Sequence, residues 1–104
     1  MRYEATRKDE ANLKDLLWRH GGLEHLEVRL HRPSLVMYSQ DGEERINRAR
    51  LTPQSKTRWR LDMPLHTGKW QATPYEGTLL ELFTLLTTTL MPWMQPLFGG
   101  GEGL

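Results

Sequence analysis

Apolar residues near the N-terminus recur at the spacing of an amphipathic helix. One helical face collects four residues at positions i, i+3, i+4 and i+7, namely Leu13, Leu16, Leu17 and His20. Thr6 can cap the start of this helix, with Asp9 three positions later. The Gly21-Gly22 pair can adopt the left-handed conformation that ends a helix. The pattern therefore predicts a first helix between Thr6 and Gly21.

From residue 26 the pattern changes from helical to alternating, which is typical of strands with one buried face. Turn residues divide this region into five strands, at about 26–31, 34–40, 44–51, 57–63 and 69–73. The Asp41-Gly42 dipeptide between the second and third strands is a strong hairpin signal. Because the connections are short, we expect the strands to pair in sequence order as an antiparallel meander.

A second helix follows the strands and has the clearest start in the chain. Thr78 and Glu81 fit the capping box, in which each side chain bonds to the backbone N–H of the other residue. Pro92 ends the helix. The apolar part is too short to cross a membrane, which takes about 20 residues. A buried helix is therefore expected, with a stripe of Leu79, Leu82, Phe83, Leu86 and Leu90.

These elements predict a single α+β domain over residues 1–98, followed by a flexible Gly-rich tail at 99–104. Both helices are expected to pack on one face of the sheet. A two-residue turn at Asp41-Gly42 pairs Met37 with Ile46, and closing the next loop in register pairs Arg48 with Arg60. The predicted core face of the sheet then consists of Leu26, Val28, Leu30, Val36, Tyr38, Ala49, Leu51, Trp59, Leu61, Trp70 and Ala72.

The distribution of charge adds a candidate contact surface on the other face. The chain carries a formal net charge of only +1, yet the segment 45–60 holds basic residues and no acidic one. The predicted register brings four arginines together, Arg48, Arg50, Arg58 and Arg60. It adds an apolar trio beside them, Leu35, Met37 and Ile46. The arginine fork suits carboxylates and phosphates, and both methionine and arginine are enriched at interface centres.

Three interpretations of this face are compatible with the sequence. It is a solvated surface whose arginines pair with nearby acids, or a protein contact, or a site for nucleic acid or another polyanion. The acids available for pairing are Glu27, Glu44 and Asp62. The low net charge weighs against nucleic acid. So does the expected burial of Trp59 and Trp70, because a buried ring cannot stack on a base.

Composition narrows the possible chemistry. The chain has no cysteine, which removes disulfides, thiolate metal sites and a cysteine nucleophile, and which fits the cytoplasm. The N-terminus has no apolar run, so it does not resemble a signal peptide. The histidines lack metal-ligand spacing, and no metal or other cofactor is expected. His66 lies in a loop with only Thr67 and Asp62 as possible companions, so the sequence favours a non-catalytic protein.

The end of the chain offers a second candidate contact. Residues 92–98 place Trp93, Met94, Leu97 and Phe98 beyond the last helix. These side chains either fold back on the core or reach a second copy of the chain, as aromatic anchors do at interfaces. The sequence therefore predicts a small protein-interaction domain that contacts itself, as a homodimer, or another protein, and no membrane. Nucleic-acid or polyanion binding through the arginines is the alternative.

Overall fold

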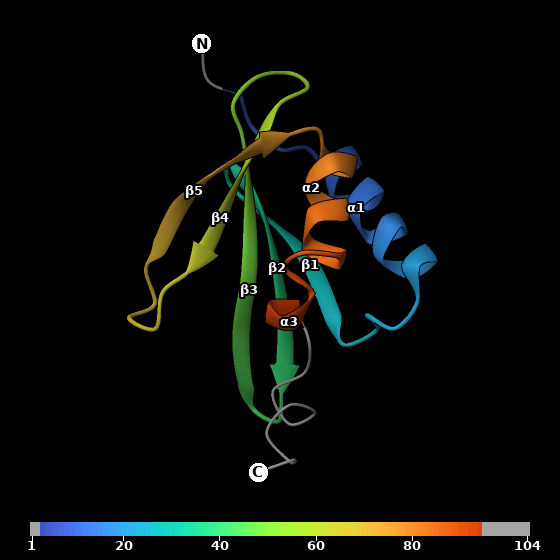
Figure 1. Cartoon of the computed structure of the whole chain (residues 1–104), viewed down its shortest axis with the longest axis vertical. Helices are drawn as coiled ribbons and strands as arrows, with labels where there is room; N and C mark the ends of the chain where they lie inside the picture. Colours follow the sequence, from blue (N-terminus) through green and yellow to red (C-terminus); the bar gives the residue numbers. More distant parts are fainter. Residues whose placement is uncertain (1–2, 95–104) are drawn as a thin grey trace.

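The computed structural model describes residues 3–94 except for the side chain of Asp41, and its elements follow the predicted order (Figure 1). Helix α1 (Arg7–His20) comes first. The strands are β1 (Leu26–His31), β2 (Ser34–Asp41), β3 (Glu44–Pro53), β4 (Trp59–Pro64) and β5 (Trp70–Gly77). Helices α2 (Leu79–Thr87) and α3 (Met91–Met94) follow. The strands form one antiparallel sheet in the order β1-β2-β3-β4-β5, which confirms the α+β class and the meander.

Both long helices begin at the predicted N-cap residues, Thr6 and Thr78, and each start forms a capping box, which the sequence predicted only for Thr78. The Thr6 hydroxyl accepts a hydrogen bond from the Asp9 N–H at 3.2 Å, and the Asp9 carboxylate accepts one from the Thr6 N–H at 2.9 Å. Thr78 and Glu81 form the same reciprocal pair, at 3.1 and 2.8 Å. These bonds satisfy N–H groups that a helix start leaves unpaired. Helix α1 ends at His20, and the residue that caps it, Gly21, has a φ of +75°, which suits glycine.

The last helical segment is shorter and more divided than predicted. Helix α2 ends at Thr87 instead of continuing to Pro92, and α3 is a separate short helix. The hydroxyls of Thr87 and Thr88 donate to the backbone carbonyls of Phe83 and Thr84. Such local bonds compete with the helical ladder, and threonine is a weak helix former. The run of threonines therefore explains the early end of α2.

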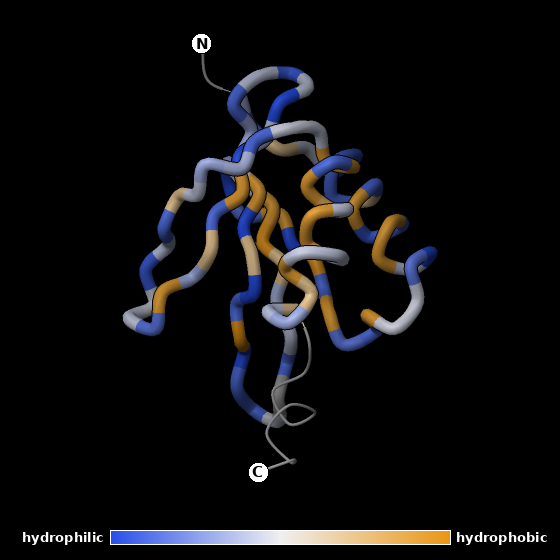
Figure 2. The backbone as a smooth tube through the Cα atoms, viewed as in Figure 1, coloured by the Kyte–Doolittle hydropathy of each residue, from blue (hydrophilic) through white to orange (hydrophobic). Residues whose placement is uncertain are grey.

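One face of the sheet joins the helices in a hydrophobic core. Figure 2 shows apolar positions gathered on α1, α2 and the central strands. The sheet contributes Leu26, Val28, Leu35, Met37, Ala49, Leu51, Trp59 and Leu61. The helices contribute Leu13, Leu17, Leu82, Phe83, Leu86 and Met94. Six of these sheet positions lie on the predicted core face, and Leu30 packs against the cluster while partly buried.

The orientation of β2 is the opposite of the one predicted. Asp41 pairs with Glu44, so the turn residues are Gly42 and Glu43, one position later than expected. Farther along, Tyr38 pairs with Asn47, but the next pair is Met37 with Ala49. Arg48 is therefore an extra residue, a β-bulge. A bulge shifts the rest of its strand by one position, and such a shift changes the face that each residue occupies.

The bulge overturns several predicted placements. Leu35 and Met37 are 0% and 1% exposed in the core, so the prediction that they lie on the outer face is wrong. Val36 and Tyr38 lie on the face of the sheet opposite the core, and neither belongs to the core cluster. A second irregularity, between Arg60 and Asp62, affects the pairing of β4 with β5.

The predicted core positions of Trp70 and Ala72 are also wrong. Ala72 pairs with Asp62, and Trp70 pairs with Pro64. Because residues opposite each other in a sheet share a face, both lie on the side of Asp62, away from the core cluster. Neither residue belongs to that cluster.

Trp59 lies in the core as predicted, and its replacement tests the assignment of the faces. We expect Trp59→Ala to lower the free energy of unfolding by about 3–5 kcal/mol, the range for a large aromatic removed from a core. Trp93→Ala serves as the control, because Trp93 is exposed. Urea unfolding followed by circular dichroism measures both. Equal stability of the two variants would contradict the core position of Trp59.

Candidate functional site

The face of the sheet opposite the core carries most of the arginines of the strands. We call it the arginine face and define it from the strand register and the ion pairs. Its charged members are Glu27, Arg29, Arg45, Arg50, Arg58, Arg60, Asp62 and Glu76. Its other members include Val36, Tyr38, Gln40, Asn47, Thr52, Pro64, Trp70 and Ala72.

A buried aspartate lies at the centre of this face. The Asp62 side chain is 0% exposed, and its carboxylate accepts hydrogen bonds from Arg50 Nε at 2.8 Å, Arg60 Nε at 2.7 Å and Thr52 Oγ1 at 2.7 Å. The side chains of Arg50 and Arg60 keep 27% and 29% of their surface exposed. They therefore cover the carboxylate while still reaching solvent. A buried charge is tolerated where it is paired and hydrogen-bonded, as here.

The surroundings of Asp62 change its affinity for protons in two opposing ways. Burial raises the pKa of the carboxyl group, because desolvation disfavours the charged form. The hydrogen bonds from Arg60, Thr52 and Arg50 lower it more, so the pKa of Asp62 is lower than its ordinary value. The hydrogen bond to Asp62 in turn raises the pKa of Arg60. Both shifts favour the charged forms of Asp62 and Arg60.

The remaining arginines of the face have other contacts. Arg58 Nε donates to Glu76 Oε1 at 2.7 Å, in an exposed pair. The Arg45 guanidinium lies 4.7 Å from the centroid of the Tyr38 ring. Such cation–π contacts fix a guanidinium without neutralising its charge. Arg50 makes a similar contact with Trp70, at 4.9 Å.

The face keeps an excess of positive charge after this pairing. The face holds five arginines and three acids, Glu27, Asp62 and Glu76, so its formal net charge is +2. Within residues 3–94, Arg29 and Arg45 form no ion pair. The interpretation as a self-neutralised surface therefore accounts for part of the face only. Glu44, one of the acids predicted to pair, forms no ion pair within the same residues.

Arg48 does not lie on the arginine face, and that predicted placement is wrong. The bulge turns it toward the core side, where it is 6% exposed. Its Nε donates to Ser39 Oγ at 3.1 Å, and its Nη1 donates to the carbonyl of Trp93 in α3 at 3.1 Å. A ring nitrogen of His25 contacts the carbonyl of Met94. The two side chains satisfy carbonyls that the end of a helix leaves unpaired.

The predicted apolar trio is not on the arginine face. Leu35 and Met37 belong to the core, and Ile46 pairs with Ser39 on the same side. Ile46 is half-buried and lines a cleft of about 420 Å³ between the start of β3 and the β4–β5 turn. The cleft lies beside the first half of β3. No strand pairs with this half along the edge toward β4, because the pairing with β4 begins only at Arg50.

The C-terminal segment divides between core and surface. Met94 is fully buried in the core cluster, whereas Trp93 is exposed. Leu97 and Phe98, the other two predicted anchors, lie outside the described residues, as does the predicted tail at 99–104. The described part of the segment thus folds back on the core through Met94 and leaves one aromatic ring at the surface.

The residues weighed as catalytic do not come together in the described part of the chain. His66 is exposed and lines the cleft beside Ile46. Asp62 is enclosed by arginines and has no hydrogen bond to His66. Residues 3–94 contain no group of three His, Asp or Glu side chains arranged for a metal ion. None of their helices is long and apolar enough to cross a membrane.

Comparison with known proteins finds no match to this chain among protein-family models, curated proteins or solved structures.

The Asp62 cluster predicts a measurable pH dependence of stability. Asp62→Asn removes the carboxylate that Arg50 and Arg60 share, and we expect it to cost about 3 kcal/mol at neutral pH. Because the folded-state pKa is lowered, the stabilisation by Asp62 is complete above the unfolded pKa. It is lost as the pH falls through the folded pKa. Urea unfolding across the acid range should therefore show a weaker pH dependence for the variant.

Glu76→Gln is the matched control, since it breaks an exposed ion pair and should cost about 1 kcal/mol or less. If Asp62→Asn were as stable as the wild type and showed the same acid dependence, Asp62 would not organise the face.

Proposed function

We propose that the protein is a small non-catalytic, cytoplasmic protein-interaction domain whose arginine face binds an acidic segment of another protein. The observation that carries this proposal is the excess of positive charge on a face that is already partly paired. Arg45 has no carboxylate partner within residues 3–94, and Arg50 and Arg60 share a single one. The absence of cysteine supports the cytoplasmic assignment.

The preorganisation of the guanidinium groups supports this assignment. Asp62 holds two of them, and the Tyr38 ring holds a third. A side chain that is already fixed loses less conformational entropy when it binds, so more of the interaction energy appears as affinity. The planar fork of arginine matches a carboxylate with two parallel hydrogen bonds.

A second copy of the chain is a poor partner for this face. A two-fold symmetric contact places the same patch of both copies together, so the two positive excesses would repel each other. The homodimer expected from the sequence therefore requires another surface.

Nucleic acid is the second candidate ligand of the face, and one observation favours it. Trp70 and Tyr38 lie on the arginine face and not in the core, which removes part of the objection from the sequence. Both rings already contact arginines, however. The protein also lacks the strongly basic balance of a typical nucleic-acid-binding domain.

Two exposed arginines allow a direct test with poly-L-glutamate as the probe. We expect fluorescence anisotropy to detect binding to the wild type at low salt. The double variant Arg45→Ser, Arg58→Ser should bind about tenfold more weakly, because it removes two guanidinium groups without touching the Asp62 cluster. The control Lys8→Ser, Arg19→Ser removes the same charge from α1, including one exposed ion pair.

The proposal is contradicted if the wild type does not bind poly-L-glutamate at low salt. It is also contradicted if the two double variants bind poly-L-glutamate equally well. Single-stranded oligothymidylate is titrated in parallel. Much tighter binding to this strand, with an affinity that falls steeply as salt rises, would favour nucleic acid.

A further inference from the structure

Strand β1 has a free edge with one unsatisfied backbone position. Its other side pairs with β2. The Leu26 N–H donates to the carbonyl of Leu23 and the Leu30 N–H donates to Glu10 Oε2, both at 3.0 Å and both away from β2. Because backbone groups alternate in direction along a strand, the Val28 N–H and C=O also point away from β2. The Val28 N–H has no hydrogen-bond partner within the described residues.

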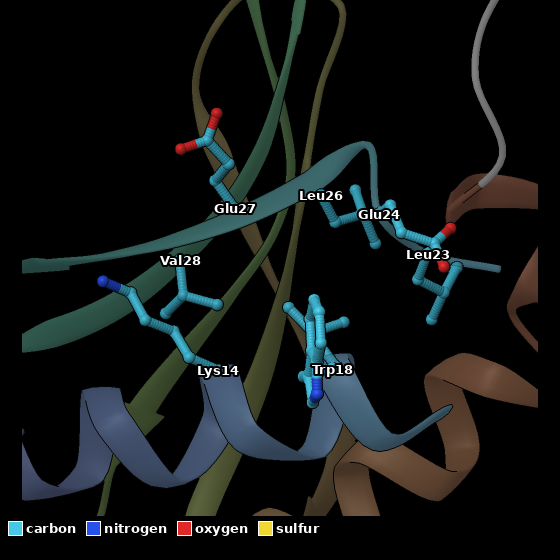
Figure 3. Close-up of a pocket in the computed structure, with 8 residues that line it drawn as sticks. Lys14, Trp18, Leu23, Glu24, Leu26, Glu27 and Val28 are labelled. Carbon is cyan, nitrogen blue, oxygen red and sulfur yellow. The ribbon is translucent and has the colours of Figure 1, made fainter. Parts of the chain in front are cut away.

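The free edge faces a groove between β1 and α1, shown in Figure 3. The groove has a volume of about 260 Å³, and its lining includes Lys14, Trp18 and Val28. In the close-up, Lys14 and Trp18 rise from α1 toward the strand, and the Val28 side chain points toward the helix. Trp18 is 81% exposed, an unusual state for the largest apolar side chain. The groove therefore brings together an unfilled volume, the exposed apolar ring of Trp18 and the unbonded backbone N–H of Val28.

We propose that a second copy of this chain pairs its own β1 with this edge, antiparallel and centred on Val28. The two Val28 residues then face each other across a two-fold axis and exchange two N–H···O=C hydrogen bonds. The same register places Glu27 of one copy opposite Arg29 of the other, twice. The two five-stranded sheets then meet edge to edge at this one hydrogen-bonded position.

The charges of β1 complement themselves in this register. Glu27 and Arg29 form no ion pair within residues 3–94, and the buried Nε of Arg29 has no hydrogen-bond partner there. Residues directly opposite on antiparallel strands have Cβ atoms about 4.5–5.5 Å apart, so opposite charges stabilise the pairing and like charges oppose it. The pairing therefore satisfies charges that one copy leaves unpaired.

The edge also limits how a second strand can bind. The next N–H groups on this edge belong to Leu26 and Leu30, on either side of Val28. They already donate to the Leu23 carbonyl and to Glu10 Oε2. Protection of this kind blunts an edge against non-specific strand addition. What remains without a hydrogen bond is a single backbone position, at Val28, which is itself only 3% exposed. A single position of this kind suits a contact whose centre lies on a two-fold axis. Pairing at this edge leaves both arginine faces uncovered, so the inference does not rest on the proposed function.

Charge reversal with rescue tests the inference. Glu27→Arg places arginine opposite Arg29 of the second copy, and Arg29→Glu places glutamate opposite Glu27. Each variant alone should weaken the dimer at least about tenfold. The double variant restores opposite charges and should recover the wild-type dimer. A mixture of the two single variants should form a heterodimer, which no effect within one chain can produce.

Light scattering after size exclusion, up to roughly 100 µM protein, measures each state. Lys8→Glu, a charge change on α1 outside the groove, is the control and should leave the dimer unchanged. Trp18→Ala alters no charge, replaces an exposed side chain at the groove and should weaken the dimer without unfolding the protein. A monomeric wild type overturns the inference, as does a dimer that none of the β1 variants or Trp18→Ala weakens.

Discussion

The β-bulge at Arg48 determines which side chains this sheet buries. The extra residue lets Leu35 and Met37 face the same side as Ala49 and Leu51, where the residues of the helices complete the core. It also turns Arg48 inward to the carbonyl of Trp93, which ties α3 to the sheet. Without the bulge, Ile46 in the first half of β3 would lie on the opposite face of the sheet from Ala49 and Leu51 in the second half. The composition of the arginine face depends on this one irregularity.

The arginine face and the β1 edge are different kinds of surface. On the face, Asp62 neutralises part of the charge and fixes Arg50 and Arg60, which leaves an oriented cationic surface. At the edge, a single free amide lies between an acid and a base, Glu27 and Arg29. A contact through the edge extends the sheet in its own plane and leaves the faces open. A dimer would then present two arginine faces on the same side of one sheet, and a long acidic segment bound to both would gain affinity through the linkage.

Local signals made the helix starts and the strand order predictable from the sequence. Each capping box involves four consecutive residues, and each turn involves a few more. The orientation of β2 was not predictable from periodicity, because Leu35 to Tyr38 is apolar at every position and fits either face. The burial of Arg48 and Asp62 had no local signal, since it arises from strand pairing with residues far along the chain. The reversal of charge around Val28 was visible in the sequence, but its meaning required the knowledge that β1 is an edge.

The pairing of β1 with itself is tested most directly at the Val28 amide by hydrogen exchange, measured by NMR at two protein concentrations. In a single copy this N–H has no partner among the described residues, so it should exchange faster than the bonded amides of Leu26 and Leu30. We predict that raising the concentration slows exchange at Val28 by at least about tenfold, and much more than at amides already bonded within one copy. Exchange at Val28 that stays fast and independent of concentration would contradict the account.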